Sequence, residues 1–273
     1  MMRTFLAAAA AAALLACQTV ETTKPGAVGV DRQQRMLVSP EEVQAASAKA
    51  YAQMIGQAKQ KGVLNRDAEQ LKRVRAITER LVAQTPAFRP DAAKWPWEVH
   101  VISVNEVNAW AMPGGKMAIY AGLIERLNAT DDEIAAVMGH EIAHSLREHA
   151  RERISRQMGT QMAVGIAGAL FGIGDLGQGL GGMVADVTLN LPNSRAHEVE
   201  ADRIGVELAA RAGFDPRAAV SLWEKMSKVG GAQGPAWLST HPPHEARIND
   251  LRAYADKVMP LYQQARGGAS VGK

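Results

Sequence analysis

Residues 130–146 read TDDEIAAVMGHEIAHSL, and this stretch decides the fold of the chain. Thr130 is followed three residues later by Glu133, a capping box that marks the start of a helix. The apolar side chains that follow recur at intervals of three and four residues, as on the buried face of a helix; they are Ile134, Val137, Met138 and Ile142. The pattern predicts one helix that runs to about Met158.

The predicted helix contains the string HEIAH at residues 140–144. Residues four apart share a helix face, so His140 and His144 can bind one zinc ion through their imidazole nitrogens. Zinc would serve as the Lewis acid in peptide hydrolysis, and Glu141 would accept the proton of the attacking water. A string this short also occurs by chance, but unpartnered imidazoles on a buried helix would be costly. The single cysteine excludes a four-cysteine zinc site, so the ligands are His, Asp or Glu.

A third zinc ligand is expected in residues 194–205, SRAHEVEADRIG. Glu198 and Asp202 lie four apart, on one face of a predicted helix. The pair suits a glutamate ligand and an aspartate that orients a zinc-bound histidine through its other ring nitrogen. The alternative is an acidic pair that faces solvent. Glu200 points to the other side of the helix, where we expect it to pair with Arg203 or with another helix.

The metzincin class of zinc peptidases would place a third histidine ten positions after His140, but that residue is Ala150. His149 falls one position short of the metzincin spacing. On a continuous helix it would lie about 140° from His144. This angle indicates a histidine at the surface, or one that supports the ligands without binding the metal.

The rest of the chain predicts a mainly helical α+β domain. Its 273 residues are 47% hydrophobic and 22% charged with a net charge of +3, which excludes a disordered chain and is unlike a nucleic-acid binder. Helices are expected at residues 40–58, 67–84, 194–212, 216–229 and 244–262. Strands are expected at residues 97–104, 108–112 and 116–120, the last two joined by a tight turn. We therefore expect a zincin-like peptidase domain at 39–265 with a small antiparallel sheet, and a tail at 266–273.

Residues 159–183 are rich in glycine and apolar side chains. Their longest uncharged apolar run, residues 162–174, is too short to span a bilayer, which takes about 20 residues. Two readings stay open: a glycine-loosened helical hairpin packed on the domain, and a mobile flap or membrane contact near the active site.

The N-terminus has the layout of a bacterial lipoprotein. Residues 1–16 carry Arg3 and an apolar run, as in a signal peptide, and end at the only cysteine. We expect Cys17 to be lipidated, with residues 17–38 as a tether between the lipid and the domain. Gln18 resembles the sorting signal for the outer membrane, which places the domain on its periplasmic side. The alternative is an ordinary signal peptide followed by a buried free cysteine.

Four strings, NAWAMPGG, HEIAH, HEVEADRIG and LSTHPPHEARI, occur in this order between residues 108 and 248. Together they resemble the gluzincin peptidases of the HtpX and CAAX-prenyl-protease family, peptidase family M48, and in particular its soluble, Oma-like branch. The resemblance implies the zinc ligands His140, His144 and Glu198, with Glu141 as general base and Asp202 behind the ligands. It also implies that His241 faces the active site, either as a substrate or oxyanion contact or as an occluding fourth ligand, and that Arg247 belongs to the same motif.

Within this resemblance, the predicted strand at 108–112 acquires a role. An extended substrate is commonly held by pairing with a sheet edge beside the metal, so Asn108, Ala109, Trp110 and Ala111 are candidate substrate-binding residues. The alternative is an ordinary interior strand. The expected function is a zinc endopeptidase for unfolded or misassembled envelope proteins, anchored to a membrane by its lipid and without a nucleic-acid partner. The competing hypothesis is an assembly factor or chaperone that holds outer-membrane clients in the same groove.

Overall fold

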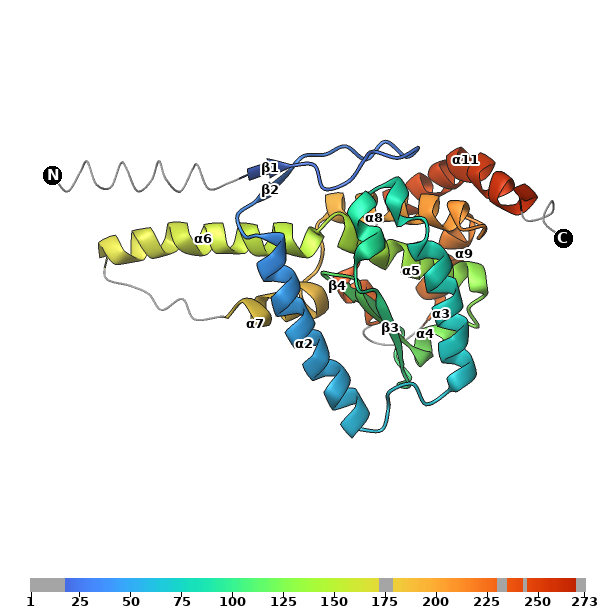
Figure 1. Ribbon diagram of the computed structural model, residues 1–273, viewed down its shortest axis with the longest axis horizontal. Helices are drawn as coiled ribbons and strands as arrows, with labels where there is room; N and C mark the ends of the chain where they lie inside the picture. The colour runs from blue at the N-terminus through green and yellow to red at the C-terminus, as the bar shows by residue number, and fades with distance from the viewer. Residues whose placement is uncertain (1–17, 172–178, 230–234, 243–244, 269–273) are drawn as a thin grey trace.

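The structure is a computed structural model that describes residues 18–171, 179–229, 235–242 and 245–268. It is a mainly helical α+β fold, as expected, in which helices surround a three-stranded sheet (Figure 1). The helices are α2 (Pro40–Gln60), α3 (Ala68–Val82), α4 (Ala121–Arg126), α5 (Asp131–Leu146), α6 (His149–Phe171), α7 (Leu180–Ala185), α8 (Arg195–Arg211), α9 (Ala218–Lys228), α10 (Trp237–Thr240) and α11 (Glu245–Gly268). Short helical turns are η1 (Thr85–Ala87), η2 (Pro90–Lys94) and the π-helical η3 (Asp186–Asn190). The strands are β1 (Gln18–Val20), β2 (Gln34–Met36), β3 (Glu98–Ile102), β4 (Ala109–Met112) and β5 (Lys116–Tyr120).

The five long helices expected outside the HEIAH segment are all present, and the capping signals explain where several begin. Ser39 and Glu42 form a reciprocal capping box at α2, and Thr130 and Glu133 form another at α5. The side chain of Ser194 accepts a hydrogen bond from the first turn of α8. Because such caps satisfy backbone N–H groups that have no partner within the helix, they mark helix starts reliably in the sequence.

The central sheet is mixed, whereas we expected it to be antiparallel. Its strand order is β3-β5-β4: β5 pairs antiparallel with β4 and parallel with β3. The tight turn at Gly114 and Gly115, both with positive φ, folds β5 back against β4. Strand β5 therefore lies between the two strands that precede it, and β4 becomes the edge strand next to the site.

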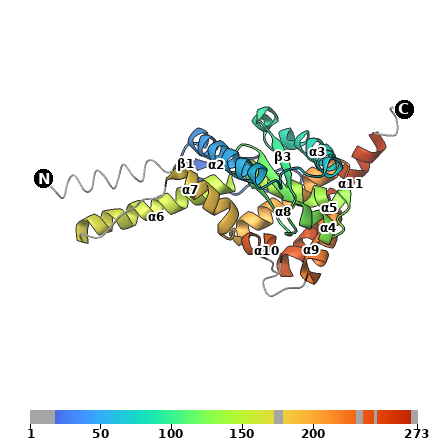
Figure 2. The same ribbon diagram turned by 90° about the horizontal axis from the view of Figure 1, so that it is seen from below.

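Helices α5 and α8 pack closely at the centre of the domain (Figures 1 and 2). A Cβ at Gly205 would lie 2.8 Å from the backbone nitrogen of His140, so only glycine permits this approach. Ile134, Met138 and Ile142 of α5 are fully buried in the core that the two helices share. The close contact brings the acidic face of α8 against the histidine face of α5.

The HEIAH helix ends earlier than expected. Helix α5 stops at Leu146, and α6 begins as a separate helix at His149. Glu148 between them has a φ of 49°, a left-handed conformation that breaks the helix. The prediction of one helix as far as Met158 is therefore wrong, and the angle calculated for His149 does not apply.

Residues 18–38, which we call the N-terminal strap, pack on the domain instead of forming a free tether. Strands β1 and β2 pair with each other, and β2 lies along α6. Val28 and Met36 are each 1% exposed, and Gln34 is fully buried. These apolar residues lack helix or strand periodicity, so the sequence pattern suggested a linker. The proposed signal peptide and Cys17 lie outside the described residues.

The glycine-rich segment is helical on both sides of residues 172–178, which lie outside the described chain. Helix α6 continues through Gly159 to Phe171 and projects beyond the rest of the described domain, and α7 leads back toward α2 (Figure 2). In the part of the chain that is described, no helix has the length and apolar character needed to cross a membrane.

Candidate metal centre

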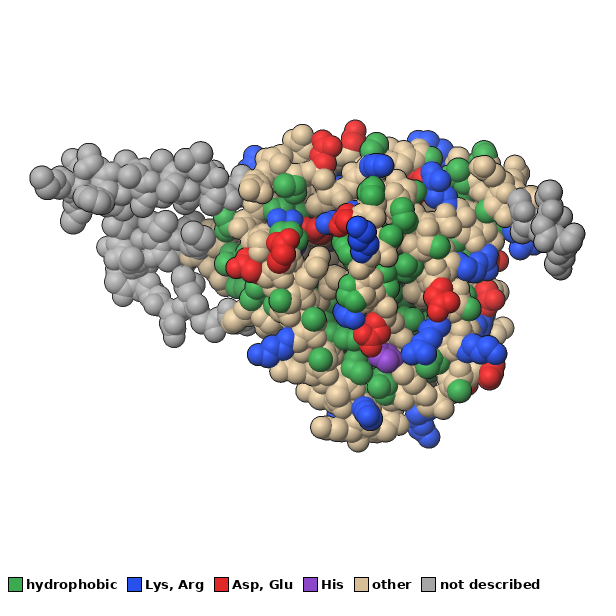
Figure 3. Space-filling view, viewed as in Figure 1, with side chains coloured by type: hydrophobic (Ala, Val, Ile, Leu, Met, Phe, Trp, Pro, Cys, Tyr) green, Lys and Arg blue, Asp and Glu red, His purple; other side chains and the backbone are tan. Residues whose placement is uncertain are grey.

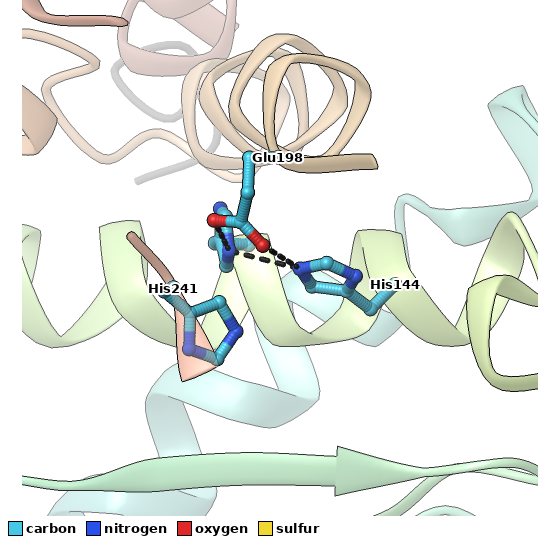
Figure 4. Close-up of side chains that lie close together, drawn as sticks. His144, Glu198 and His241 are labelled. Carbon is cyan, nitrogen blue, oxygen red and sulfur yellow. Dashed lines mark hydrogen bonds and ion pairs between the residues drawn. The ribbon is translucent and has the colours of Figure 1, made fainter. Parts of the chain in front are cut away.

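Three histidines and one glutamate converge at the contact between α5 and α8. His140 and His144 come from α5, Glu198 from α8, and His241 from the residue after α10. Each offers one possible ligand atom, and these atoms lie within 4.8 Å of one another. Figure 4 shows the Glu198 carboxylate pointing from α8 toward His144, with His241 on the near side. All four residues are buried.

The spacing of the first three ligand atoms fits zinc. The Nε2 atoms of His140 and His144 are 3.0 Å apart, and they lie 3.6 and 3.4 Å from the two Glu198 oxygens. A tetrahedral zinc ion with bonds of about 2.0–2.1 Å has ligand atoms roughly 3.3–3.4 Å apart. The three side chains therefore surround a point that a zinc ion can occupy with little movement.

The Glu198 carboxylate is buried and lacks hydrogen bonds within the described chain, which also suits a metal ligand. It is 1% exposed, yet neither oxygen accepts a hydrogen bond from the described residues. Arg247 Nη1 lies 2.8 Å from Oε2 as an ion pair, but outside hydrogen-bond geometry, and Oε1 lies 3.4 Å from Nε2 of His144. A buried carboxylate without hydrogen bonds is costly, and a metal ion at the point shared with His140 and His144 removes that cost.

Asp202 lies behind His140, as expected. Its Oδ1 is 2.9 Å from His140 Nδ1, so Nδ1 carries the proton and Nε2 is free to bind the metal. Arg247 donates two hydrogen bonds to Asp202, at 2.7 and 2.8 Å. Burial alone would raise the pKa of Asp202, but the charge of Arg247 outweighs burial and holds this pKa well below its usual range. Asp202 therefore stays ionised and can orient His140.

Glu141 lies beside the proposed metal position, with its Oε1 3.5 Å from Nε2 of His241. It accepts hydrogen bonds from Trp237 Nε1 at 2.8 Å and from the backbone nitrogen of Ala111 at 3.1 Å. Burial raises the pKa of Glu141 to about 7, although the charge of His140 and the Trp237 hydrogen bond oppose the rise. A carboxylate with a pKa near neutrality is suited to accept a proton from water.

His241 lies where the resemblance placed it, but its role is still to be tested. Its ring stacks on Trp237, with centroids 4.4 Å apart, and its Nε2 is 3.5 Å from Glu141 Oε1. Burial lowers the pKa of both His241 and His144 well below the usual value, which keeps the rings neutral and able to bind a metal. The position suits a fourth ligand as well as a contact to substrate.

Two residues outside the expected ligand set, His149 and Glu200, lie next to the site. His149 is buried, with Nδ1 2.8 Å from Nδ1 of His144, and its Nε2 lies 3.1 Å from Glu200. Of the two partners expected for Glu200, Arg203 binds Asp250 instead, and Glu200 pairs with another helix through His149 of α6. Of the two roles considered for His149, the structure favours support of the ligands.

Edge strand β4 runs past Glu141. Because Tyr120 N donates to Asn108 O, the antiparallel pattern turns the backbone groups of Ala109 and Ala111 away from β5. Ala111 lines the cleft, whereas Trp110 packs in a separate apolar cluster on the other face of the sheet. The strand thus has the position needed for substrate pairing, but Ala111 N already donates to Glu141.

The cleft beside Glu141 and His144 is narrow in this structure. Its volume is about 30 Å³, enough for one or two water molecules. Val187 and Thr188 of η3 line the cleft together with His241, and Arg153 of α6 donates to Val187 O at 2.5 Å. This volume is too small for an extended peptide, so the cleft must widen for a peptide to bind beside Glu141.

These features place the chain in a class of zinc-binding peptidase domains, and the comparisons with known proteins agree. The family model described as peptidase family M48 matches residues 68–255, well over half of the chain, and the chain belongs to this family. The cofactor of the site is zinc. All four motif strings that carried the resemblance lie within the matched range.

Among curated relatives, the mitochondrial metalloendopeptidase OMA1 of Schizosaccharomyces pombe is 38% identical over 160 residues, which cover 58% of this chain and 46% of the relative. The mitochondrial metalloendopeptidase OMA1 of Bos taurus is 31% identical over 204 residues, 68% of this chain and 37% of the relative. The beta-barrel assembly-enhancing protease of Escherichia coli is 31% identical over 191 residues, 64% of this chain and 38% of the relative. The chain thus spans about half or less of the length of these relatives.

Proposed function

We propose that this protein is a zinc-dependent endopeptidase. The observation that carries the proposal is the position of Glu141, which is buried beside the cluster of His140, His144 and Glu198 with its pKa raised to about 7. Bound zinc would supply the Lewis acid at this cluster. Glu141 takes the proton of the attacking water, and Asp202 keeps His140 in the tautomer that binds the metal.

The substrates we propose are unfolded or misassembled proteins of the bacterial envelope. Backbone pairing with β4 is independent of side-chain sequence, which suits unfolded clients. The similarity to a beta-barrel assembly-enhancing protease supports an envelope role, while the similarity to the OMA1 proteins supports the endopeptidase activity only. On the face shown in Figure 3, basic and acidic side chains are interspersed, without a large patch of one sign.

The activity is tested with purified, zinc-loaded protein and unfolded casein. We expect cleavage by the wild type and a loss of about 10² to 10⁴ in rate for Glu141→Gln, with the zinc content unchanged. Glu79→Gln, a change at an exposed glutamate of α3, is the matched control and should cleave normally. Casein that is bound but not cut by the wild type would favour the chaperone hypothesis, and undiminished cleavage by Glu141→Gln would contradict the assigned base.

We further propose lipidation at Cys17 and attachment to the periplasmic side of the outer membrane, based on the signal-like segment before it. Cys17→Ser should move the protein from the membrane fraction to the soluble fraction, or leave the signal peptide uncleaved. Mass spectrometry of the mature N-terminus provides the direct test. An unacylated Cys17 would disprove the anchor without affecting the proposed activity.

A further inference from the structure

The N-terminal strap contacts, through Arg32, residues that lie next to the ligands of the metal centre. The guanidinium of Arg32 binds both oxygens of Glu200, and it donates to Glu152 at 2.7 and 2.8 Å. The two glutamates come from α8 and α6 and are only 6% and 4% exposed. Arg32 thus joins two buried carboxylates that lie 48 residues apart in the chain.

The strap also holds the other arginine of this cluster. Arg147 follows α5 and is fully buried; its Nη2 donates to the backbone oxygen of Arg32 at 2.8 Å, and its Nε donates to Glu200 at 2.9 Å. Gln34 of the strap donates to the backbone oxygen of Arg147 at 2.7 Å. The strap therefore fixes Glu200 both through its own guanidinium and through Arg147.

In the chain of hydrogen bonds from Glu200 through His149 to His144, the donor and acceptor of each bond follow from the chemistry of the groups. Glu200 as a carboxylate can only accept, so Nε2 of His149 carries a proton and donates to it. In a neutral His149 ring, Nδ1 is then an acceptor, and it accepts a hydrogen bond from the protonated Nδ1 of His144, 2.8 Å away. The remaining nitrogen of His144, Nε2, has a free lone pair and faces Glu198 and His140.

The two histidine ligands are thus supported in different ways. His140 is oriented directly by Asp202, whereas His144 is oriented by Glu200 through His149. We propose that His149 and Glu200 are positioning residues that fix His144 for zinc binding, and that Arg32 of the N-terminal strap completes this support by holding Glu200. The strap lies before residue 68, where the family match begins, so the support comes from outside the matched domain.

Neighbouring contacts agree with a positioning role. The ring of His197 stacks on His149 with centroids 4.3 Å apart and an interplanar angle of 13°. His197 Nε2 is 3.2 Å from Glu152, which Arg32 also binds. His149 is therefore fixed in its plane by stacking and along its edge by two hydrogen bonds, as a group that orients a metal ligand must be.

The test measures the zinc dissociation constant of the full-length chain by competition with a chromogenic chelator. His149→Leu should bind zinc about 10- to 100-fold more weakly. His149→Asn keeps an acceptor close to the position of Nδ1 but loses the contact to Glu200, so it should recover only part of this loss. Arg32→Leu, and Arg32→Gln if the leucine variant does not fold, should weaken zinc binding several-fold. The visible spectrum of the Co²⁺-substituted variants should shift as well, because the geometry of the ligands changes.

Arg203→Leu is the matched control. Arg203 lies on the same helix as Glu200 and makes a bidentate ion pair with Asp250. Its side chain is 29% exposed, compared with 34% for Arg32. It should lower stability without changing the zinc dissociation constant. Wild-type zinc affinity in His149→Leu or in the Arg32 variant, or an equal loss in Arg203→Leu, would overturn the proposal. The inference rests on the zinc site of the proposed function, but the readout does not require peptide hydrolysis, so failure of the peptidase activity would be recognised separately.

Discussion

Glu141→Gln should stabilise the zinc-free protein at alkaline pH while it abolishes catalysis. The ionised carboxylate of Glu141 is buried, and burial raises its pKa from the ordinary 4.5 to about 7. A folded protein that must hold this carboxylate ionised pays a free-energy cost that glutamine, an uncharged mimic of the protonated acid, avoids. The substitution therefore measures how much the ionised Glu141 carboxylate destabilises the fold, separately from its role in catalysis.

The magnitude and the pH window follow from the two pKa values. Below about pH 4.5 the acid is protonated in both the folded and the unfolded state, and wild type and variant should be equally stable. Above about pH 7 it is ionised in both states, and the full cost applies; the difference between the two pKa values corresponds to about 3 kcal/mol. Glu141→Gln should thus gain less than about 1 kcal/mol at pH 5 and about 3 kcal/mol at pH 8.

The assay is urea unfolding of wild type and Glu141→Gln in the presence of a chelator at pH 5 and pH 8. Glu79→Gln, on the exposed face of α3, should show no such pH-dependent gain. In zinc-loaded protein the gain should shrink, because the nearby positive charge favours the ionised carboxylate. Equal stability of wild type and Glu141→Gln at pH 8, or a larger gain at pH 5 than at pH 8, would refute the reasoning.

Three further predictions concern the ligands and their neighbours. Glu198→Gln should lose zinc almost completely, whereas Glu200→Gln should only weaken binding, and a chelator titration in which Glu200→Gln is the worse binder would reverse the assignment. His241→Ala should lower kcat by about 10²- to 10³-fold if the ring stabilises the developing oxyanion, and raise it if the ring blocks the zinc; a casein assay with unchanged turnover would leave His241 as a loop residue. Asp202→Asn should weaken zinc binding by about 10- to 100-fold at pH 7, since the amide no longer fixes the charge and tautomer of His140, and an unaltered dissociation constant would contradict this role.

Much of the ligand set could be predicted because it depends on local helix geometry. A spacing of four residues puts His140 beside His144 and Glu198 beside Asp202, and both pairs share a face in α5 and α8. The close packing of these helices depends on Gly139 and Gly205, where a Cβ atom would collide with the other helix. Because the two glycines lie in distant segments, this contact could not be predicted from the sequence. His241 could not be placed by periodicity at all, and it was found through its motif.

His149 was misplaced because the sequence gives no clear sign of the break at Glu148. Helix-breaking residues such as glycine or proline are absent from residues 145–150. The carboxylate of Glu148, whose backbone is left-handed, instead binds Arg89, which is 59 residues away in the chain, and Arg151, which is three residues away. A long-range partner such as Arg89 can override local helix propensity. The break turns His149 back onto His144, which a continuous helix would prevent.

The N-terminal strap shows the same limit for packing. Its sequence has isolated apolar residues among glycine, proline and polar side chains, a composition typical of a linker. The strap is ordered by its contacts with the domain. Arg32 binds two buried carboxylates, and Gln34 donates to the backbone oxygen of Arg147, just after α5. Neither partner can be recognised before α5, α6 and α8 are assembled. A segment that looks like a tether can therefore be part of the domain when the domain presents buried charges that this segment helps to neutralise.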